Sequence, residues 1–431
     1  MKFISTRNRA KPLGFSQAIR QGLASDGGLY VPQSFSHFDM TADLARLVNL
    51  ADLTLSEVSQ EILKKISSND PLFSLAEEIC SEAFDFALPL KQLNQKTSVL
   101  ELYHGPTAAF KDVGARFLAS CLARAQSAKP DIVLVATSGD TGGAVASAFF
   151  KKPQVKVVIL FPENGVSPRQ RQQLSCWGEN ILSLAVSGTF DDCQALVKRA
   201  FVENTEEKSF HLLSANSINI GRILPQSFYY AWAALEYQRR HQRTPGFVVP
   251  SGNLGNAVAA LWAKQMGFPI GKIVLACNAN HAVVDFVNTG NWQPQSTIRT
   301  LANAMDVGNA SNMERLQNIY TDRTKLLADV AAFSVLDSEI QQTIQRGEND
   351  WGEVWCPHTA CAVASREKLK EGDWIIVATA HPAKFEQIVE PLVGHALEVP
   401  SSFSKIINLP EKSKKMTVSY QDLMREIIDF G

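Results

Sequence analysis

Lys111 lies in a stretch of the chain whose composition is unusual around a lysine. The residues before it, 105–110, are small or apolar, and a helical pattern follows, so the sequence predicts a turn and a partly buried side chain. A partly desolvated lysine amine loses its proton more easily and can attack a carbonyl carbon, the chemistry by which enzymes hold pyridoxal phosphate as a Schiff base. A surface lysine at a helix start is the alternative, and this segment alone does not decide between the two.

A second candidate is the loop at residues 251–256, between an apolar run at 247–250 and a helical pattern at 257–266. Converging backbone N–H groups and a helix N-terminus make such a loop an anion site. It has neither the GK[ST] ending of a Walker A motif nor the GxGxxG spacing of a dinucleotide fingerprint. The loop therefore indicates a phosphate that belongs to neither ATP nor NAD, unless its glycines serve only a tight turn.

A third candidate is the loop at residues 137–143, which also joins an apolar run to a helical pattern. Ser138 and Thr141 offer hydroxyl groups, and the loop N–H groups face a helix start, an arrangement that suits a carboxylate. Asp140 is a further candidate, but a plain helix N-cap explains it equally well.

The elements that must position these loops alternate between strand and helix. Short, nearly continuous apolar runs predict buried parallel strands at 132–136, 155–161, 181–186, 247–250, 273–277 and 374–379. Helical patterns lie at 115–125, 143–149, 191–201, 226–238 and 257–266, so the fold class is α/β with parallel sheets. Ligands of such sheets bind beyond the carboxyl ends of the strands, where Ser138, Ser251 and Thr379 fall.

Length and composition limit the remaining possibilities. A chain of 431 residues is expected to form two or three domains. We expect an N-terminal domain at 1–90, a large domain at 91–115 and 205–431, and a smaller domain at 116–204. The charged residues 411–415 are expected to be a solvated linker.

A net charge of −1 gives no field that would attract nucleic acid or an anionic membrane. The sequence has neither a signal peptide nor a run long enough to span a membrane, so we expect a cytoplasmic protein. Seven scattered cysteines favour reduced thiols. The spacing of Cys356, His358 and Cys361 fits no common zinc site, and no metal is expected.

Motifs along nearly the whole chain resemble the threonine synthases, pyridoxal-phosphate enzymes of fold type II in the tryptophan-synthase-β-like family. They run in the family's order, and those at the N-terminus and at 303–312 resemble the longer, bacterial and fungal type. The matching stretches are 5–7, 15–19, 22–32, 104–107, 110–112, 137–142, 216–226, 251–256, 303–312, 357–360 and 379–385. Ala108 and Leu254 depart from the family pattern, but both are apolar exchanges that remove no reacting group.

The resemblance implies two parallel-sheet α/β domains with the cofactor between them, plus an N-terminal domain. It also implies conversion of O-phospho-L-homoserine and water to L-threonine and phosphate by γ-elimination and β-addition of water. The cofactor would be pyridoxal 5'-phosphate and the enzyme a monomer or homodimer. The implied cofactor-binding residues are Lys111, which is also catalytic, Ser251, Gly252, Asn253, Leu254, Gly255, Asn256 and Thr379.

The substrate would be held by residues of two further motifs. The resemblance assigns its carboxylate to the loop with Ser138, Asp140 and Thr141, although Asp140 could instead face the substrate ammonium or cap the helix. Arg222 is the best candidate for the substrate phosphate, because a guanidinium matches phosphate bidentately, and Asn219 lies in the same motif. Lys384 is a weaker candidate.

Two other functions remain open from the sequence. One is a dehydratase or β-replacing synthase that acts on serine, threonine or O-acetylserine with the same cofactor. The other is a non-catalytic pyridoxal-phosphate-binding protein on the same fold.

Overall fold

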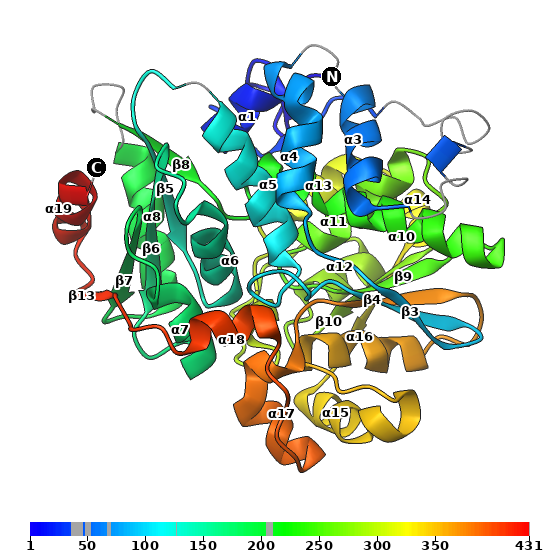
Figure 1. Cartoon of the computed structure of the whole chain (residues 1–431). Coiled ribbons are helices and arrows are strands. Elements are labelled where there is room, and N and C mark those ends of the chain that lie inside the picture. Colours follow the sequence, from blue (N-terminus) through cyan, green and yellow to red (C-terminus); the bar gives the residue numbers. More distant parts are fainter. Residues whose placement is uncertain (36–45, 48–52, 67–69, 126, 204–209, 431) are drawn as a thin grey trace.

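Two largely parallel β-sheets and an N-terminal domain make up the computed structural model, which describes residues 1–35, 46–47, 53–66, 70–125, 127–203 and 210–430 (Figure 1). The α/β class expected from alternating strand and helix patterns is confirmed. In the described part of the chain, no helix is long and apolar enough to cross a membrane.

The larger sheet has six strands in the order β11–β10–β9–β12–β4–β3, and only the pairing of β3 with β4 is antiparallel. Three of its strands were predicted from their apolar runs. The bounds are β3 (Leu90–Asn94), β4 (Thr97–Glu101), β9 (Gly246–Pro250), β10 (Ile273–Cys277), β11 (Val330–Ser334) and β12 (Trp374–Ala378).

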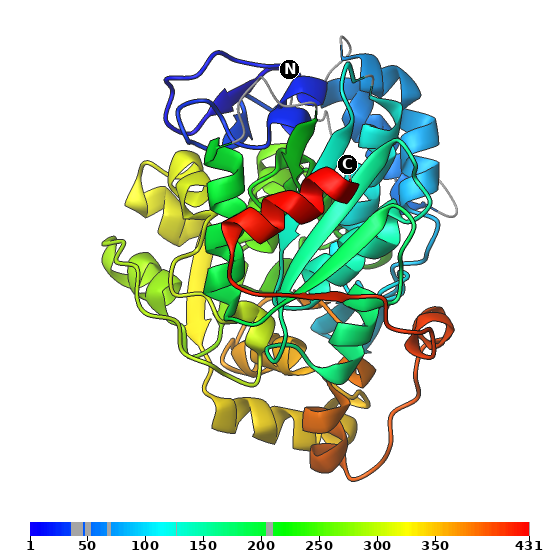
Figure 2. The same ribbon diagram turned by 90° about the vertical axis from the view of Figure 1, so that its left-hand side faces the viewer.

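The smaller sheet has five parallel strands in the order β13–β7–β6–β5–β8. They are β5 (Asp131–Ala136), β6 (Val155–Pro162), β7 (Ile181–Val186), β8 (His211–Ser214) and β13 (Lys414–Met416). The expectation of a linker at 411–415 is wrong for Lys414 and Lys415, which pair with β7 as part of β13, whereas 411–413 form neither helix nor strand. Figure 2 shows the chain leading on from this edge strand to α19 (Tyr420–Phe430), which lies in front of the smaller sheet.

Helices cover both faces of each sheet because successive strand side chains point to opposite faces. In the larger sheet, Phe247 and Val249 pack with α11 (Gly255–Gln265), whereas Val248 packs with α16 (Pro357–Glu367). In the smaller sheet, one face packs on α6 (Asp140–Phe149) and the other on α8 (Phe190–Glu203), with α19 lying against α8. Both sheets are thus buried on both faces, as continuous apolar strands require.

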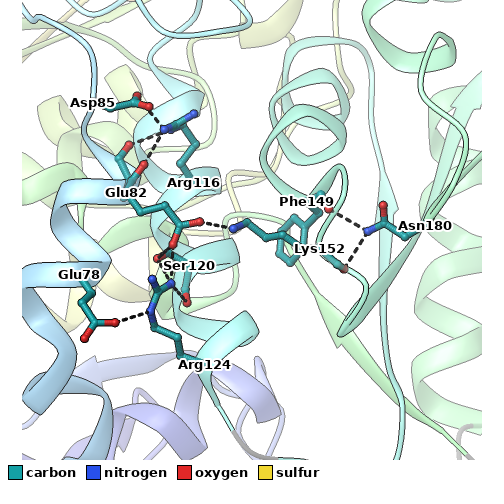
Figure 3. A network of polar contacts seen from close by, with 10 residues as sticks. Glu78, Glu82, Asp85, Arg116, Ser120, Arg124, Phe149, Lys152 and Asn180 are labelled. Atoms are coloured by element: carbon teal, nitrogen blue, oxygen red, sulfur yellow. Dashed lines mark hydrogen bonds and ion pairs between the residues drawn. The ribbon is translucent and has the colours of Figure 1, made fainter.

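The N-terminal domain packs on the helices between the sheets. It contains β1 (Phe3–Ser5), β2 (Tyr30–Pro32), α1 (Phe15–Gln21), α3 (Leu55–Ile66), η1 (Pro71–Leu75) and α4 (Ala76–Ala83). Glu82 of α4 accepts hydrogen bonds from Ser120 (2.7 Å) and Arg124 of α5 (Lys111–Arg124) and from Lys152, which precedes β6 (Figure 3). One carboxylate therefore ties the N-terminal domain to both neighbouring parts of the chain.

The remaining helices complete the two layers around the sheets. They are α7 (Pro168–Ser175), α9 (Ile220–Ile223), α10 (Gln226–His241), α12 (Ala282–Thr289), η2 (Asn303–Met305), α13 (Met313–Ile319), α14 (Arg323–Asp329), α15 (Asp337–Trp351), η3 (Pro382–Phe385), α17 (Glu386–Val393) and α18 (Ser401–Ile407). The domain boundaries stay a prediction, and the one at 204–205 lies outside the described residues. Two strands within 205–431, β8 and β13, belong to the smaller sheet.

Candidate active site

A cavity of about 920 Å³ lies where the carboxyl ends of strands from both sheets meet. Residues at or just after the ends of β5, β6, β8, β9 and β12 line it: Ala136, Pro162, Asn216, Pro250 and Thr379. This is the position at which parallel α/β sheets bind ligands. Among the residues that the structure describes, no group of three or more His, Cys, Asp or Glu side chains could hold a metal ion.

Lys111 is the first residue of α5 and lines this cavity. The loop that leads to it is fastened to the segment after β12, because Phe110 donates its N–H to Thr379 O (2.8 Å) and His381 donates to Ala108 O (3.1 Å). The helix begins four residues before the predicted one, and Asp112 in its first turn accepts hydrogen bonds from the N–H (2.8 Å) and hydroxyl (2.6 Å) of Thr107. These bonds fix Lys111 beside the end of β12.

The surroundings of Lys111 favour its neutral amine. Burial lowers its pKa below the ordinary value; Asp140 opposes this shift, and the positive charges of Lys384 and Arg222 reinforce it. The partial burial expected from the composition of the segment is what the structure shows. A lysine with a lowered pKa in a cavity can act as a nucleophile and as a carrier of protons.

The loop at 251–256 connects β9 to the N-terminus of α11. Ser251 uses its N–H on Ala276 O (2.8 Å) and its hydroxyl on Val249 O (2.9 Å). Over the described residues, the N–H groups of 252–256 make no hydrogen bond outside their own helix. At Gly252, a Cβ atom would lie 2.6 Å from the Cα of Met305, so only glycine lets the two backbones approach this closely. The arrangement leaves backbone donors facing the cavity at a helix N-terminus.

Asn256 supplies a side-chain donor at the same place. Its Oδ1 accepts hydrogen bonds from the hydroxyls of Tyr229 and Tyr230, the latter at 2.7 Å, while its buried Nδ2 has no partner among the described residues. A buried amide that lacks a partner is costly, so an acceptor from a ligand is expected to satisfy it. Asn253, in contrast, turns to neighbouring loops, where its side chain binds Ser217 (3.0 Å) and Ser311 (2.6 Å to N–H).

Both departures from the family pattern have left-handed backbone. Ala108 has φ of 53° and Leu254, the N-cap of α11, has φ of 60°. Side chains with a Cβ rarely adopt this region, and such strain gathers at functional sites. Leu254 lines the cavity, and Ala108 precedes Lys111 by three residues in the loop that leads to it.

The loop at 137–143 leads from β5 to α6. Thr137 accepts hydrogen bonds from the N–H groups of Gly139 (3.0 Å) and Gly142 (2.9 Å), and Gly139 has φ of 141°, a conformation that other residues avoid. Gly139 is the N-cap of α6, so Asp140 belongs to the first turn and does not cap the helix. Ser138, Asp140 and Thr141 all line the cavity.

Asp140 forms an ion pair that the sequence did not predict. Lys384 of η3 places its Nζ 2.9 Å from Asp140 Oδ1 and 2.8 Å from the carbonyl oxygen of Thr107, and its side chain is 1 % exposed. Burial raises the pKa of Asp140, but Lys384 and Lys111 outweigh this effect, and the pKa falls below the ordinary value. Lys384 does not line the cavity, so the structure does not offer it to a substrate phosphate.

Arg222 of α9 lines the cavity, whereas Asn219 does not. The guanidinium of Arg222 is buried and donates from Nη1 to Ala215 O, and its Nε has no partner within the described residues. Burial lowers the pKa of Arg222 to about 10, so it stays protonated at neutral pH. Asn219 is the N-cap of α9, and it also donates to Ile19 O (2.7 Å) and Ser214 O (2.7 Å).

His358 and Arg299 also line the cavity, although neither was a predicted site residue. His358 Nε2 accepts a hydrogen bond from the N–H of Ala304 (3.1 Å), and burial lowers the pKa of His358 to about 4, so the ring is neutral with its proton on Nδ1. Arg299 lies on the exposed side of the cavity. No periodic pattern marks either residue, because both belong to irregular loops or helix starts.

Family models cover almost the whole chain. A model described as pyridoxal-phosphate dependent enzyme matches residues 87–380. Models described as threonine synthase N terminus and threonine synthase, C-terminal match residues 2–84 and 359–428.

Similar proteins and solved structures agree with these models. Threonine synthase of Escherichia coli strain K12 is 38 % identical over 429 residues, which cover 99 % of each chain. That of Serratia marcescens is 37 % identical and covers 99 % of this chain and 98 % of its own. The crystal structure of the E. coli enzyme superposes with a TM-score of 0.91 over 100 % of both chains at 36 % identity. The crystal structure of pyridoxal-phosphate-bound threonine synthase from Brucella melitensis superposes with a TM-score of 0.91 at 31 % identity, and the match covers 100 % of this chain and 99 % of that one.

Proposed function

This chain belongs to the threonine synthase family of pyridoxal-phosphate-dependent enzymes and converts O-phospho-L-homoserine and water to L-threonine and phosphate, and we propose how its residues do so. The reaction is a γ-elimination of phosphate followed by β-addition of water, the last step of threonine biosynthesis. The observation that carries the proposed roles is the single cavity that gathers Lys111, the glycine loop and Arg222.

The residues around the cavity suit pyridoxal phosphate. When bound, the cofactor acts as an electron sink that stabilises negative charge on substrate carbons. We assign its covalent link to Lys111 and its phosphate to the N–H groups of 252–256, with the unpartnered Nδ2 of Asn256 as a further donor. The hydroxyl of Thr379 would form a hydrogen bond with the pyridine nitrogen. Thr379 follows β12, and its carbonyl oxygen accepts a hydrogen bond from Phe110 in the loop that leads to Lys111.

Lys111 then carries protons during the reaction. Its nitrogen is positioned by the first turn of α5, and burial together with two nearby cations favours the neutral amine, which can accept a proton from the substrate. Asp140 can stabilise the protonated form when Lys111 has accepted that proton. Asp140 favours the protonated amine, whereas Lys384 and Arg222 favour the neutral one. Both protonation states of Lys111 are therefore accessible, as a group that acts as base and then as acid requires.

The substrate needs partners for its carboxylate and its phosphate. Ser138 and Thr141 offer hydroxyls at the start of α6 and support a carboxylate site there. Arg222, with an unpartnered Nε, supports a phosphate site, and Arg299 on the exposed side of the cavity offers a second cation. We leave Asn219 out of the proposed substrate site, because its polar atoms bond to the chain around α9.

The proposed location and partners of the protein rest on the composition of the chain. We propose a cytoplasmic monomer or homodimer that acts on a small molecule and binds no nucleic acid. The near-zero net charge supports the last point. Seven cysteines, all buried and unpaired, suit a reducing compartment.

The test is to incubate the purified protein with pyridoxal phosphate and O-phospho-L-homoserine and to quantify threonine, 2-oxobutyrate and free phosphate together. We expect equal amounts of threonine and phosphate, and no turnover with Lys111→Ala. Phosphate with 2-oxobutyrate would mean that water fails to add. Absence of phosphate, with turnover of serine or threonine, would overturn the proposed substrate.

A further inference from the structure

A buried ion pair connects the two sheets beside Lys111. Lys384 follows β12 of the larger sheet and Asp140 follows β5 of the smaller one, and their charged atoms lie 2.9 Å apart. Both side chains are almost inaccessible, with exposed fractions of 1 % and 6 %. The Thr107 carbonyl accepts the second hydrogen bond of Lys384 at 2.8 Å, and Gln170 of α7 donates to the same Asp140 oxygen at 3.3 Å.

The two members of this pair have different positions relative to the cavity. Asp140 lines it, whereas Lys384 does not, so the carboxylate and not the ammonium can contact a ligand in the cavity. Burying two charges costs several kcal/mol per ion, and apolar residues of similar volume often give equal or higher stability. Stability alone is therefore a weak reason for this pair, and its place next to Lys111 indicates a functional one.

The charges around the pair come from every element that packs on it. The groups that interact with it are Lys111 and Asp112 of α5, His358 of α16 and His381 just before η3, and Arg222 of α9 acts on Lys111. Burial lowers the pKa of both histidines to about 4, so they are neutral at physiological pH. Asp140 is thus the carboxylate that acts on both Lys111 and Lys384, whereas Asp112 acts on Lys384 and accepts its hydrogen bonds from Thr107.

We propose that Lys384 is a positioning residue of the active centre: it holds Asp140 as an oriented anion in the cavity wall, and the pair sets the protonation of the Lys111 nitrogen while that nitrogen carries the cofactor. Lys384 contributes a positive charge that disfavours a proton on Lys111, and Asp140 contributes a negative charge that favours it. This inference rests on the proposed link between Lys111 and pyridoxal phosphate.

The test measures the absorbance of the bound cofactor as a function of pH, which changes as the Lys111 nitrogen loses its proton. The variants are Lys384→Met, Lys384→Arg, Asp140→Asn and the double variant Lys384→Met/Asp140→Asn. We expect Asp140→Asn to lower the midpoint by about one pH unit or more and Lys384→Met to raise it by a similar amount, because a neighbouring charge shifts a titration by about one to three units. The double variant should return to within a few tenths of the wild type, and Lys384→Arg should match the wild type.

Lys368→Met is the matched control, because it breaks a 2.9 Å ion pair with Glu339 on the surface. Its midpoint should equal that of the wild type. An unchanged midpoint in Asp140→Asn overturns the proposal. A second result also overturns it: Lys384→Met has the wild-type midpoint, and Asp140→Asn lowers the midpoint by the same amount whether or not Lys384 is present. If Lys384→Met does not fold, Asp140→Asn decides alone.

The same titration separates this inference from the proposed function. If the wild-type protein binds no cofactor, or if Lys111→Ala keeps the same absorption band, the proposed role of Lys111 fails. If that band depends on Lys111 but not on the charges of Asp140 and Lys384, only the further inference fails.

Discussion

Replacing Arg222 with alanine should strongly impair use of the phosphorylated substrate. In the structure, Nη1 of Arg222 is occupied by Ala215 O, while Nε has no partner and the residue lines the cavity. The free side of the guanidinium can thus donate about two charge-assisted hydrogen bonds to a phosphate, each worth about 1.5–3 kcal/mol. Their loss amounts to about 3–6 kcal/mol, and each 1.4 kcal/mol is a factor of ten, so kcat/KM should fall by about 10²–10⁴.

Steady-state release of phosphate from O-phospho-L-homoserine measures this effect. Arg222→Lys keeps the charge but not the two-pronged geometry and should recover only part of the loss. Because Arg222→Ala also leaves the Ala215 carbonyl without its partner, cofactor affinity and the melting temperature are measured in parallel. A fall of less than threefold in kcat/KM, or an inhibition constant for inorganic phosphate equal to that of the wild type, would refute the assignment. Arg299→Ala, at the exposed side of the cavity, should have a smaller effect.

Three further predictions follow from buried or paired groups. NMR titration of His358 should give a midpoint near pH 4. Because the pKa is lower in the folded state than in the unfolded state, the stability that the neutral ring allows is complete above about pH 6.5 and is lost as the pH falls towards 4. Burial raises the pKa of Glu82, but hydrogen bonds from Lys152, Ser120 and Arg124 outweigh it and lower the pKa to about 2. Since this carboxylate is 35 % exposed, we expect it to contribute only about 1–2 kcal/mol to the free energy of unfolding after solvent screening. This contribution is present above about pH 4.5 and is lost as the pH falls towards 2. Acid unfolding of Glu82→Gln should lack this part of the pH dependence. Asn256→Asp should weaken pyridoxal phosphate binding by about 100-fold or more in equilibrium titration, because it replaces a free donor with an anion; unchanged affinity would contradict the role of Asn256.

Strands buried on both faces were predicted well from the sequence. Residues 181–186 and 273–277 form β7 and β10 with the predicted bounds, because their runs are apolar except for Ser183 and end at polar residues. By contrast, β4 begins with Thr97 and Ser98 and ends with Glu101, and no apolar run marks it. Its polar side chains are buried through partners far along the chain, such as Arg366, which donates to the Thr97 hydroxyl (3.1 Å). Such partners cannot be found by inspecting neighbouring residues.

The candidate site was predicted where one loop carries the chemistry and missed where two distant segments share it. Lys111, the loop at 251–256 and the loop at 137–143 all face one cavity, as their places after strands suggested. The pair of Asp140 with Lys384 joins segments more than 200 positions apart, so no local pattern indicates it. Asn219 is close in sequence to a candidate arginine, but the structure places it as a helix N-cap outside the cavity, which local sequence does not reveal.

The pairing of β13 with β7 has a consequence for synthesis of the chain on the ribosome. Within the described residues, β7 has β6 on one side and Lys414–Met416 on the other. The strands β5, β6, β7 and β8 emerge long before that last segment, so one edge of β7 has open N–H and C=O groups while the rest of the protein is being made. An unpaired edge can recruit a strand from another molecule. The nascent protein is therefore open to aggregation through this edge from the time β7 emerges until Lys414–Met416 emerge and pair with it.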